Sequence, residues 1–199
     1  MKEPLHQNIS PVMTKTILVL LILVSSAFCI LIIPQLLGAQ TQKKADVWSR
    51  FKFFEGKWEG TGNGEPGTSK VEREYEFVLT GTFLSVKNKS TYAPQEKNPK
   101  GEVHEDWGFF SHDRARKLFV LRQFNMEGFV NQYILDTLHT DSIVIVFVTE
   151  AIENIAPGWK GKETYTILND DEFVETFELA GPGKEFEVYS KNTLKRVRR

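Results

Sequence analysis

Ten short β-type runs follow one another from residue 57 to residue 194, and no amphipathic helical pattern lies between them. Turn residues such as Gly, Pro, Asn and Asp separate the runs, so successive strands are expected to form hairpins. A hairpin-connected sheet this long exposes two edges unless it closes on itself. The sequence therefore predicts an all-β, ten-stranded antiparallel up-and-down barrel. The predicted strands are 57–62, 69–79, 82–92, 103–111, 117–124, 129–138, 142–149, 162–168, 172–179 and 185–194.

Alternation within these runs indicates strands with two different faces. In the second run, Arg73 and Tyr75 share a face with apolar residues, and three glutamates occupy the opposite face. In the ninth run, Glu175 lies on the apolar side, out of pattern. Each run is therefore expected to present one face to an interior and one to water.

A hydrophobic leader precedes the strands and is expected to be helical. Residues 17–33 are apolar except for two serines, a lysine lies before them, and residues 37–39 are Leu-Gly-Ala. This order is typical of a secretory signal, although the length is also at the lower limit for a membrane anchor. We predict a signal peptide or membrane anchor over 1–39, a linker over 40–50 and a barrel domain over 51–199. The mature domain would be secreted or periplasmic, or membrane-anchored through an uncleaved leader.

Composition and motifs exclude several classes of function. A formal net charge of −1 argues against a nucleic-acid partner, and the only cysteine, Cys29, lies in the leader, so no thiolate metal site is expected. Residues 62–67 fit the dinucleotide fingerprint, but a strand pattern follows them, which favours a hairpin turn. Glu163 and Glu175 would suit acid–base chemistry only if both faced inward and lay close together. We therefore expect a protein that is not an enzyme and has no metal site.

Polar residues inside apolar runs are the candidates for a ligand site, because pockets are mostly apolar with a few orienting groups. Asn131 and Tyr133 would supply an amide and a phenol. Arg122 and Gln123 are adjacent, so only one can join them, and an inward Arg122 would favour a carboxylate-bearing ligand. The predicted ligand-binding residues are Tyr75, Trp107, Phe109, Arg122, Gln123, Asn131 and Tyr133. We predict that they bind a small hydrophobic or amphipathic molecule in the lumen; alternatively they form a buried network that only fixes the barrel.

The run 103–111 is expected to contribute aromatic side chains to the lining of this pocket. We place Trp107 and Phe109 on its inner face, which puts His104 and Asp106 on the outer face, in water. Truncating the Trp107 side chain is then expected to weaken ligand uptake.

Both ends of the barrel domain resemble a known superfamily. The opening stretch 53–60, which contains Gly-Lys-Trp, resembles the first strand of calycin barrels, and the closing stretch that ends near Arg196 resembles their last strand. In such barrels a basic side chain near the C-terminus covers the first-strand tryptophan. The resemblance implies that Gly56 and Trp58 are structural residues and that Lys195 or Arg196 covers Trp58 through a cation–π contact.

The stretches between residues 104 and 133 look like a group of bacterial domains of unknown function with a lipocalin-like barrel, near the nitrobindin-type haem-binding proteins. The resemblance covers residues 50–196. Those relatives hold haem iron through a histidine late in the barrel, whereas this chain has none after His139. No cofactor is therefore expected; the alternative is haem bound by His104, His112 or His139.

The run 142–149 is apolar on both faces. Its outer face is expected to meet the N-terminal segment or a second copy of the chain, which makes a homodimer a candidate assembly. An interaction module with a filled lumen is the remaining alternative.

Overall fold

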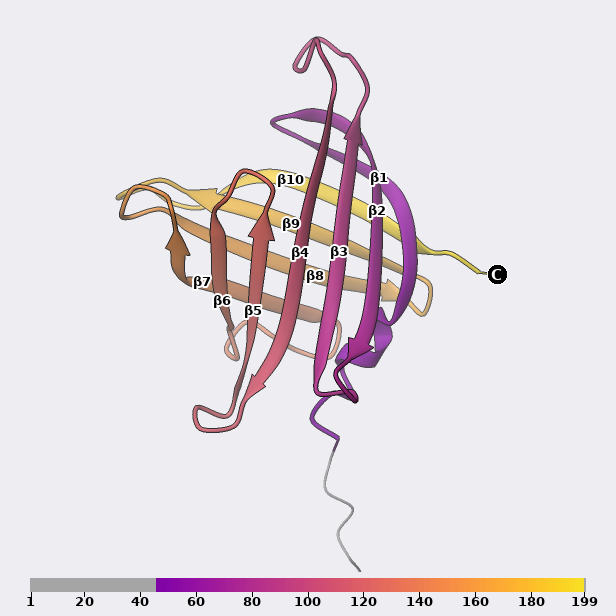
Figure 1. Ribbon diagram of the computed structural model, residues 1–199, viewed down its shortest axis with the longest axis vertical. Coiled ribbons are helices and arrows are strands. Elements are labelled where there is room, and N and C mark those ends of the chain that lie inside the picture. Colours follow the sequence, from indigo (N-terminus) through magenta and orange to yellow (C-terminus); the bar gives the residue numbers. More distant parts are fainter. Residues whose placement is uncertain (1–45, 199) are drawn as a thin grey trace, which may run out of the picture. The chain divides into compact units, whose positions relative to one another are not determined.

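The computed structural model describes residues 46–198, and the leader predicted over residues 1–39 lies outside this part of the chain. Ten antiparallel strands close into a barrel in the order β1-β10-β9-β8-β7-β6-β5-β4-β3-β2 (Figure 1). The predicted all-β, up-and-down barrel is confirmed. Within residues 46–198 no helix is long and apolar enough to cross a bilayer. The elements are a 3-10 helix η1 (Phe51–Phe54) and the strands β1 (Gly56–Gly64), β2 (Gly67–Val78), β3 (Phe83–Tyr92), β4 (Glu102–Asp113), β5 (Leu118–Asn125), β6 (Val130–Leu135), β7 (Val144–Glu153), β8 (Lys160–Asn169), β9 (Glu172–Ala180) and β10 (Glu187–Arg196).

Each predicted run corresponds to one strand, and local turn chemistry explains the differences at the ends. β6 ends at Leu135, earlier than predicted, because Asp136 Oδ1 accepts hydrogen bonds from the backbone N–H groups of Leu138 and His139. Gly64 and Gly67 face each other across the β1–β2 hairpin, so the glycine-rich stretch is a turn between two strands.

Aromatic side chains fill the end of the barrel where η1 lies. Phe51 and Phe54 project from η1 into the core and are fully buried, and Trp48 joins them from the preceding turn. Trp48, within the segment 40–50 predicted as a linker, is thus part of the packed core. Because η1 closes this end, any space inside the barrel can open only at the opposite end.

Trp58 and Arg196 meet at the β1–β10 seam. The two residues are directly opposite in the strand pairing and therefore point to the same face, whereas Lys195 points to the other. The Arg196 guanidinium lies 4.1 Å from the centre of the Trp58 ring. It also donates hydrogen bonds to the carbonyl oxygens of Phe53 and Glu55, at 2.7 and 2.8 Å. Of the two basic residues predicted to cover Trp58, Arg196 is the one that does.

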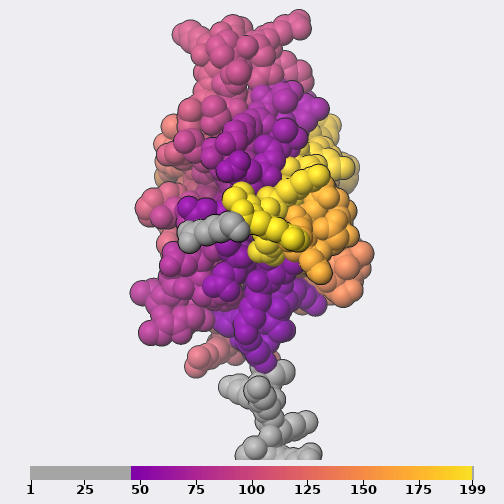
Figure 2. Space-filling view, turned by 90° about the vertical axis from the view of Figure 1, so that its right-hand side faces the viewer, coloured from indigo at the N-terminus to yellow at the C-terminus, as the bar shows by residue number. Residues whose placement is uncertain are grey.

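The same seam depends on glycine. A Cβ atom on Gly60 would lie 1.8 Å from the carbonyl oxygen of Thr193 on β10, so any side chain there would push the strands apart. Figure 2 shows the yellow C-terminal residues against the indigo N-terminal residues, where the first and last strands meet.

We expect Arg196→Ala to lower the free energy of unfolding by about 2–4 kcal/mol, because it removes the cation–π contact and two charge-assisted hydrogen bonds. Lys195→Ala is the matched control: its side chain is 73 % exposed, and we expect a change within about 0.5 kcal/mol. Urea unfolding followed by tryptophan fluorescence measures both. Equal losses in the two variants would contradict a special role for Arg196.

Candidate ligand-binding site

The inner face of the barrel has two halves of different chemistry. Aromatic side chains pack the half nearest η1. The other half encloses a cavity of about 420 Å³ that lies toward the β1–β2, β3–β4, β5–β6, β7–β8 and β9–β10 hairpins. This cavity is the candidate site.

A ring of buried polar side chains separates the two halves, and we call it the polar belt. Strand pairing places several members directly opposite each other: Arg73 opposite Asn88, Asn88 opposite Asp106, Gln123 opposite Asn131 and Glu175 opposite Asn192. β1 contributes Gly62 instead, where a Cβ atom would lie 2.4 Å from Asn192 Oδ1. The polar belt consists of Arg73 (β2), Asn88 (β3), Asp106 (β4), Gln123 (β5), Asn131 (β6), Glu163 (β8), Glu175 (β9) and Asn192 (β10), all of which line the cavity.

Arg73 and Glu175 form a buried ion pair across this ring. Arg73 Nη2 lies 2.7 Å from Glu175 Oε2, and Asn192 Nδ2 donates to the same oxygen at 2.8 Å. Arg73 Nη1 donates to the backbone carbonyls of Glu72 and Lys89. Burial lowers the pKa of Arg73, but the neighbouring Glu175 charge outweighs it and the net pKa is raised. The pair is therefore charged on both sides and almost fully hydrogen-bonded.

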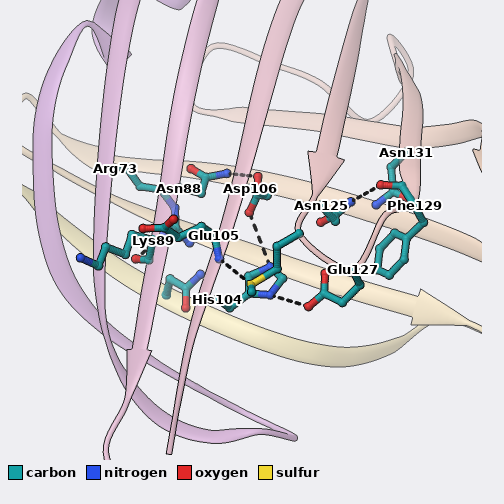
Figure 3. A network of polar contacts seen from close by, with 12 residues as sticks. Arg73, Asn88, Lys89, His104, Glu105, Asp106, Asn125, Glu127, Phe129 and Asn131 are labelled. Carbon is teal, nitrogen blue, oxygen red and sulfur yellow. Dashed lines mark hydrogen bonds and ion pairs between the residues drawn. The ribbon is translucent and has the colours of Figure 1, made fainter.

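A second chain of polar contacts runs from the belt toward the cavity mouth (Figure 3). Asn88 Nδ2 donates to Asp106 Oδ1 at 2.7 Å. His104 Nε2 lies 3.8 Å from Asp106 Oδ2, and His104 Nδ1 lies 2.9 Å from Glu127 Oε1. Burial raises the pKa of Asp106 to about 6, so its carboxylate is ionised at neutral pH.

Glu163 is the exceptional member of the belt. It is 7 % exposed, and its Oε2 atom has no hydrogen-bond partner among the described residues. Asn88 Oδ1 also lacks a partner among these residues. Burial first, and then the charges of Glu175 and Asp106, raise the pKa of Glu163 well above its usual value. Glu163 and Glu175 both face the lumen, but Glu175 is already ion-paired. Two buried oxygens on the cavity floor, Glu163 Oε2 and Asn88 Oδ1, therefore lack a partner within residues 46–198.

Apolar side chains line the cavity on the mouth side of the belt. They come from β7, β9 and the β5–β6 and β7–β8 loops, so the cavity has a polar floor and an apolar upper wall. This distribution matches an amphipathic guest whose polar part points toward the belt. The apolar residues are Phe129, Ile152, Ile155, Phe177 and Leu179.

Three predicted ligand-binding residues line the cavity. Gln123, Asn131 and Tyr133 face the lumen, and Asn131 Nδ2 donates to the Tyr133 hydroxyl at 3.0 Å. Of the adjacent pair, Arg122 faces outward, where its Nε donates to Gln132 Oε1 at 3.0 Å, so it cannot hold a ligand carboxylate in the lumen. Tyr75 faces inward but belongs to the aromatic core rather than to the cavity lining.

The predicted orientation of β4 is wrong. Trp107 is 55 % exposed on the outer surface, with the Lys87 ammonium 5.2 Å from its ring centre, and Phe109 lies on the same outer face. His104 and Asp106 face the lumen instead. The more apolar face of β4 points outward because the lumen beside it is polar and because Gly108 leaves space for Val86, to which an added Cβ would come within 2.7 Å.

The four charged members of the belt were not among the predicted ligand-binding residues, although Glu163 and Glu175 had been considered as an inward-facing pair. Glu175 interrupts the apolar face of its strand, and Arg73 shares a face with Tyr75, so both carried a visible signal of inward charge. Asp106 was overlooked because the sequence analysis placed its side of the run 103–111 on the outer, solvent-facing surface. A search for oppositely charged residues on apolar faces would have found the Arg73–Glu175 pair.

The three histidines considered for haem lie in different surroundings. His104 is the cavity-lining histidine of the described chain, with Nδ1 2.9 Å from Glu127 Oε1 and Nε2 3.8 Å from Asp106 Oδ2. His112 packs on Phe119, and His139 lies in an exposed loop with Nδ1 2.7 Å from Asp136 Oδ2.

Comparisons with known proteins support the fold. No protein-family model and no curated protein matches the chain. The crystal structure of Rv2717c from M. tuberculosis is similar at a TM-score of 0.58 and 17 % identity, over 77 % of this chain and 99 % of that one. A de novo designed fluorescence-activating β-barrel has a TM-score of 0.38 at 13 % identity, over 73 % and 95 %. A DUF3598-family protein of unknown function from Nostoc punctiforme has 0.27 at 7 %, over 76 % and 99 %. TM-scores of 0.38 and 0.27 are too low to support a shared fold.

Asp106→Asn keeps an oxygen that can accept from Asn88 and removes the buried charge. The pKa of Asp106 is about 6 in the folded protein against 3.8 for an ordinary aspartate. The folded state therefore binds the proton more tightly, and its free energy of unfolding falls as the pH rises between these values. We expect the free energy of unfolding of the variant, relative to that of the parent, to rise by about 2–3 kcal/mol as the pH goes from about 4 to about 7. Urea unfolding across this range measures the gain, and a difference that does not change with pH would contradict it.

Proposed function

We propose that this protein binds a small amphipathic molecule non-covalently inside its barrel and does not act on it chemically. One observation carries the proposal: among the described residues, two buried oxygens on the cavity floor, Glu163 Oε2 and Asn88 Oδ1, have no hydrogen-bond partner. Leaving a buried acceptor unsatisfied costs about 1–3 kcal/mol, so a structural lumen would be expected to fill or pair these atoms. A guest that pairs them explains why they are there.

The two-part lining supports an amphipathic guest rather than a purely apolar one. Burial against the apolar upper wall would supply about 25 cal/mol per Å² of apolar surface. The polar belt would then orient the guest, with Gln123, Asn131 and Tyr133 among its contacts. The Glu163–Glu175 pair favours binding over acid–base catalysis, because Glu175 is fixed by Arg73 and Asn192.

We further propose that the protein acts outside the cytoplasm. The order of charged, apolar and small residues in the leader supports export. The resemblance to calycin and nitrobindin-type barrels supports a carrier role without naming the cargo.

The test uses the neutral fluorophore N-phenyl-1-naphthylamine, whose emission rises when it is buried. We expect the intact protein to bind it and Ser90→Phe to weaken binding at least about tenfold, because Ser90 faces the lumen and the new ring would occupy the cavity. Lys89→Phe is the matched control, since it adds the same side chain to the outer face of β3. Trp107→Ala should also leave binding unchanged, which replaces the expectation drawn from the sequence.

Two results would contradict the proposal. Either the intact protein does not bind the fluorophore and carries no small molecule in native mass spectrometry after purification from its own host, or Ser90→Phe and Lys89→Phe weaken binding equally.

A further inference from the structure

We propose that the guest carries a protonated amine, which binds on the cavity floor to Glu163, Asp106 and Asn88. This inference rests on the carrier function proposed above and specifies the chemical class of the cargo. It follows from two unpaired acceptors and from an excess of carboxyl groups in the polar belt.

The acceptors of the belt are open. Glu163 Oε2 and Asn88 Oδ1 are buried and have no partner within residues 46–198. The orientation of the Asn88 amide follows from its neighbour, because Nδ2 must be the atom that donates to Asp106 Oδ1. The second oxygen of Asp106 makes no hydrogen bond within the described chain and lies 3.8 Å from His104 Nε2. These three oxygens, on β8, β3 and β4, therefore have no hydrogen-bond donor among the described residues.

The strongest donors of the belt are already engaged. Arg73 donates through Nε and Nη2 to Glu175 and through Nη1 to two backbone carbonyls. Asn192 Nδ2 donates to Glu175, and Asn131 Nδ2 donates to the Tyr133 hydroxyl. A ligand carboxylate would therefore have to displace existing bonds to reach the guanidinium of Arg73.

Charge points in the same direction. The belt holds three carboxyl groups, Asp106, Glu163 and Glu175, against one guanidinium, and that guanidinium is paired with Glu175. Asp106 is ionised at neutral pH because its pKa is about 6. A cation would gain attraction from this excess of acid, and an anion would be repelled by it.

Glu163 adapts to such a cation. The ionisable groups that interact with it are Arg73 and Tyr75 on β2, Asp106 on β4, Tyr133 on β6, Tyr165 on β8 and Glu175 on β9. Burial and the charges of Glu175 and Asp106 raise the pKa of Glu163 well above its usual value. An ammonium beside Glu163 would lower this pKa and favour an ion pair, with the carboxyl proton released to solvent.

A primary ammonium fits these contacts better than other polar groups. It carries three N–H donors and no acceptor, which matches three open oxygens. Its bonds to carboxylates are charge-assisted and stronger than those of a hydroxyl group. The apolar upper wall, with Phe177 and Leu179, would hold the hydrocarbon part of the same molecule.

The experiment compares three ligands that share one alkyl chain: n-octylamine, octan-1-ol and octanoate. Each is titrated against the complex of the protein with N-phenyl-1-naphthylamine near neutral pH and at low salt. We expect octylamine to bind at least about tenfold more tightly than octanol, with octanoate the weakest. Glu163→Gln and Asp106→Asn, which keep side-chain size, should each reduce the preference for the amine over the alcohol. Glu76→Gln removes one negative charge from the exposed outer face of β2 and should keep the preference.

The outcomes separate this inference from the function on which it rests. If the three ligands compete equally, if octanoate competes best, or if Glu163→Gln and Asp106→Asn both keep the amine preference, the amine site is wrong while the carrier function stands. If the intact protein binds neither the fluorophore nor any of the three ligands, the carrier function fails and the amine site fails with it. Binding of the neutral fluorophore by both amide variants shows that they remain folded.

Discussion

Closure of the sheet at the β1–β10 seam is the constraint from which the rest of the structure follows. Because no edge strand remains, every second residue of every strand must share one interior. Arg196 holds this seam by stacking on Trp58 and by bonding the backbone that leads out of η1, and Gly60 lets the two strands approach. Inward-facing side chains must then either fill the interior or surround a cavity. In this barrel they fill the end beside η1 and surround a cavity at the opposite end.

The polar belt marks the level at which packing stops. Burying ionised groups is expensive, and the Arg73–Glu175 pair offsets that cost only because nearly all of its hydrogen-bonding capacity is met. Glu163 has no such partner, so the belt is complete on one side of the lumen and open on the other. Binding and stability are therefore linked: a guest that satisfies the open acceptors also removes a cost that the empty barrel carries.

Prediction from the sequence succeeded where local chemistry decides the structure. Turn residues separated all ten strands, and opposite-residue pairing explains why Arg196 rather than Lys195 covers Trp58. It failed on β4, because the rule that apolar faces point inward assumes an apolar interior. Trp107 lies outside and Asp106 inside, since the lumen at that level is polar.

The sequence by itself determined the strands, their hairpin order and the closed topology, because turns and alternation act over a few neighbouring residues. It also placed Asn131 and Tyr133 together on one strand face. Only the tertiary structure decided which face of each strand became the interior. It alone brought Glu163 and Asp106, residues far apart along the chain, to one cavity, because curvature and strand register place side chains across a lumen.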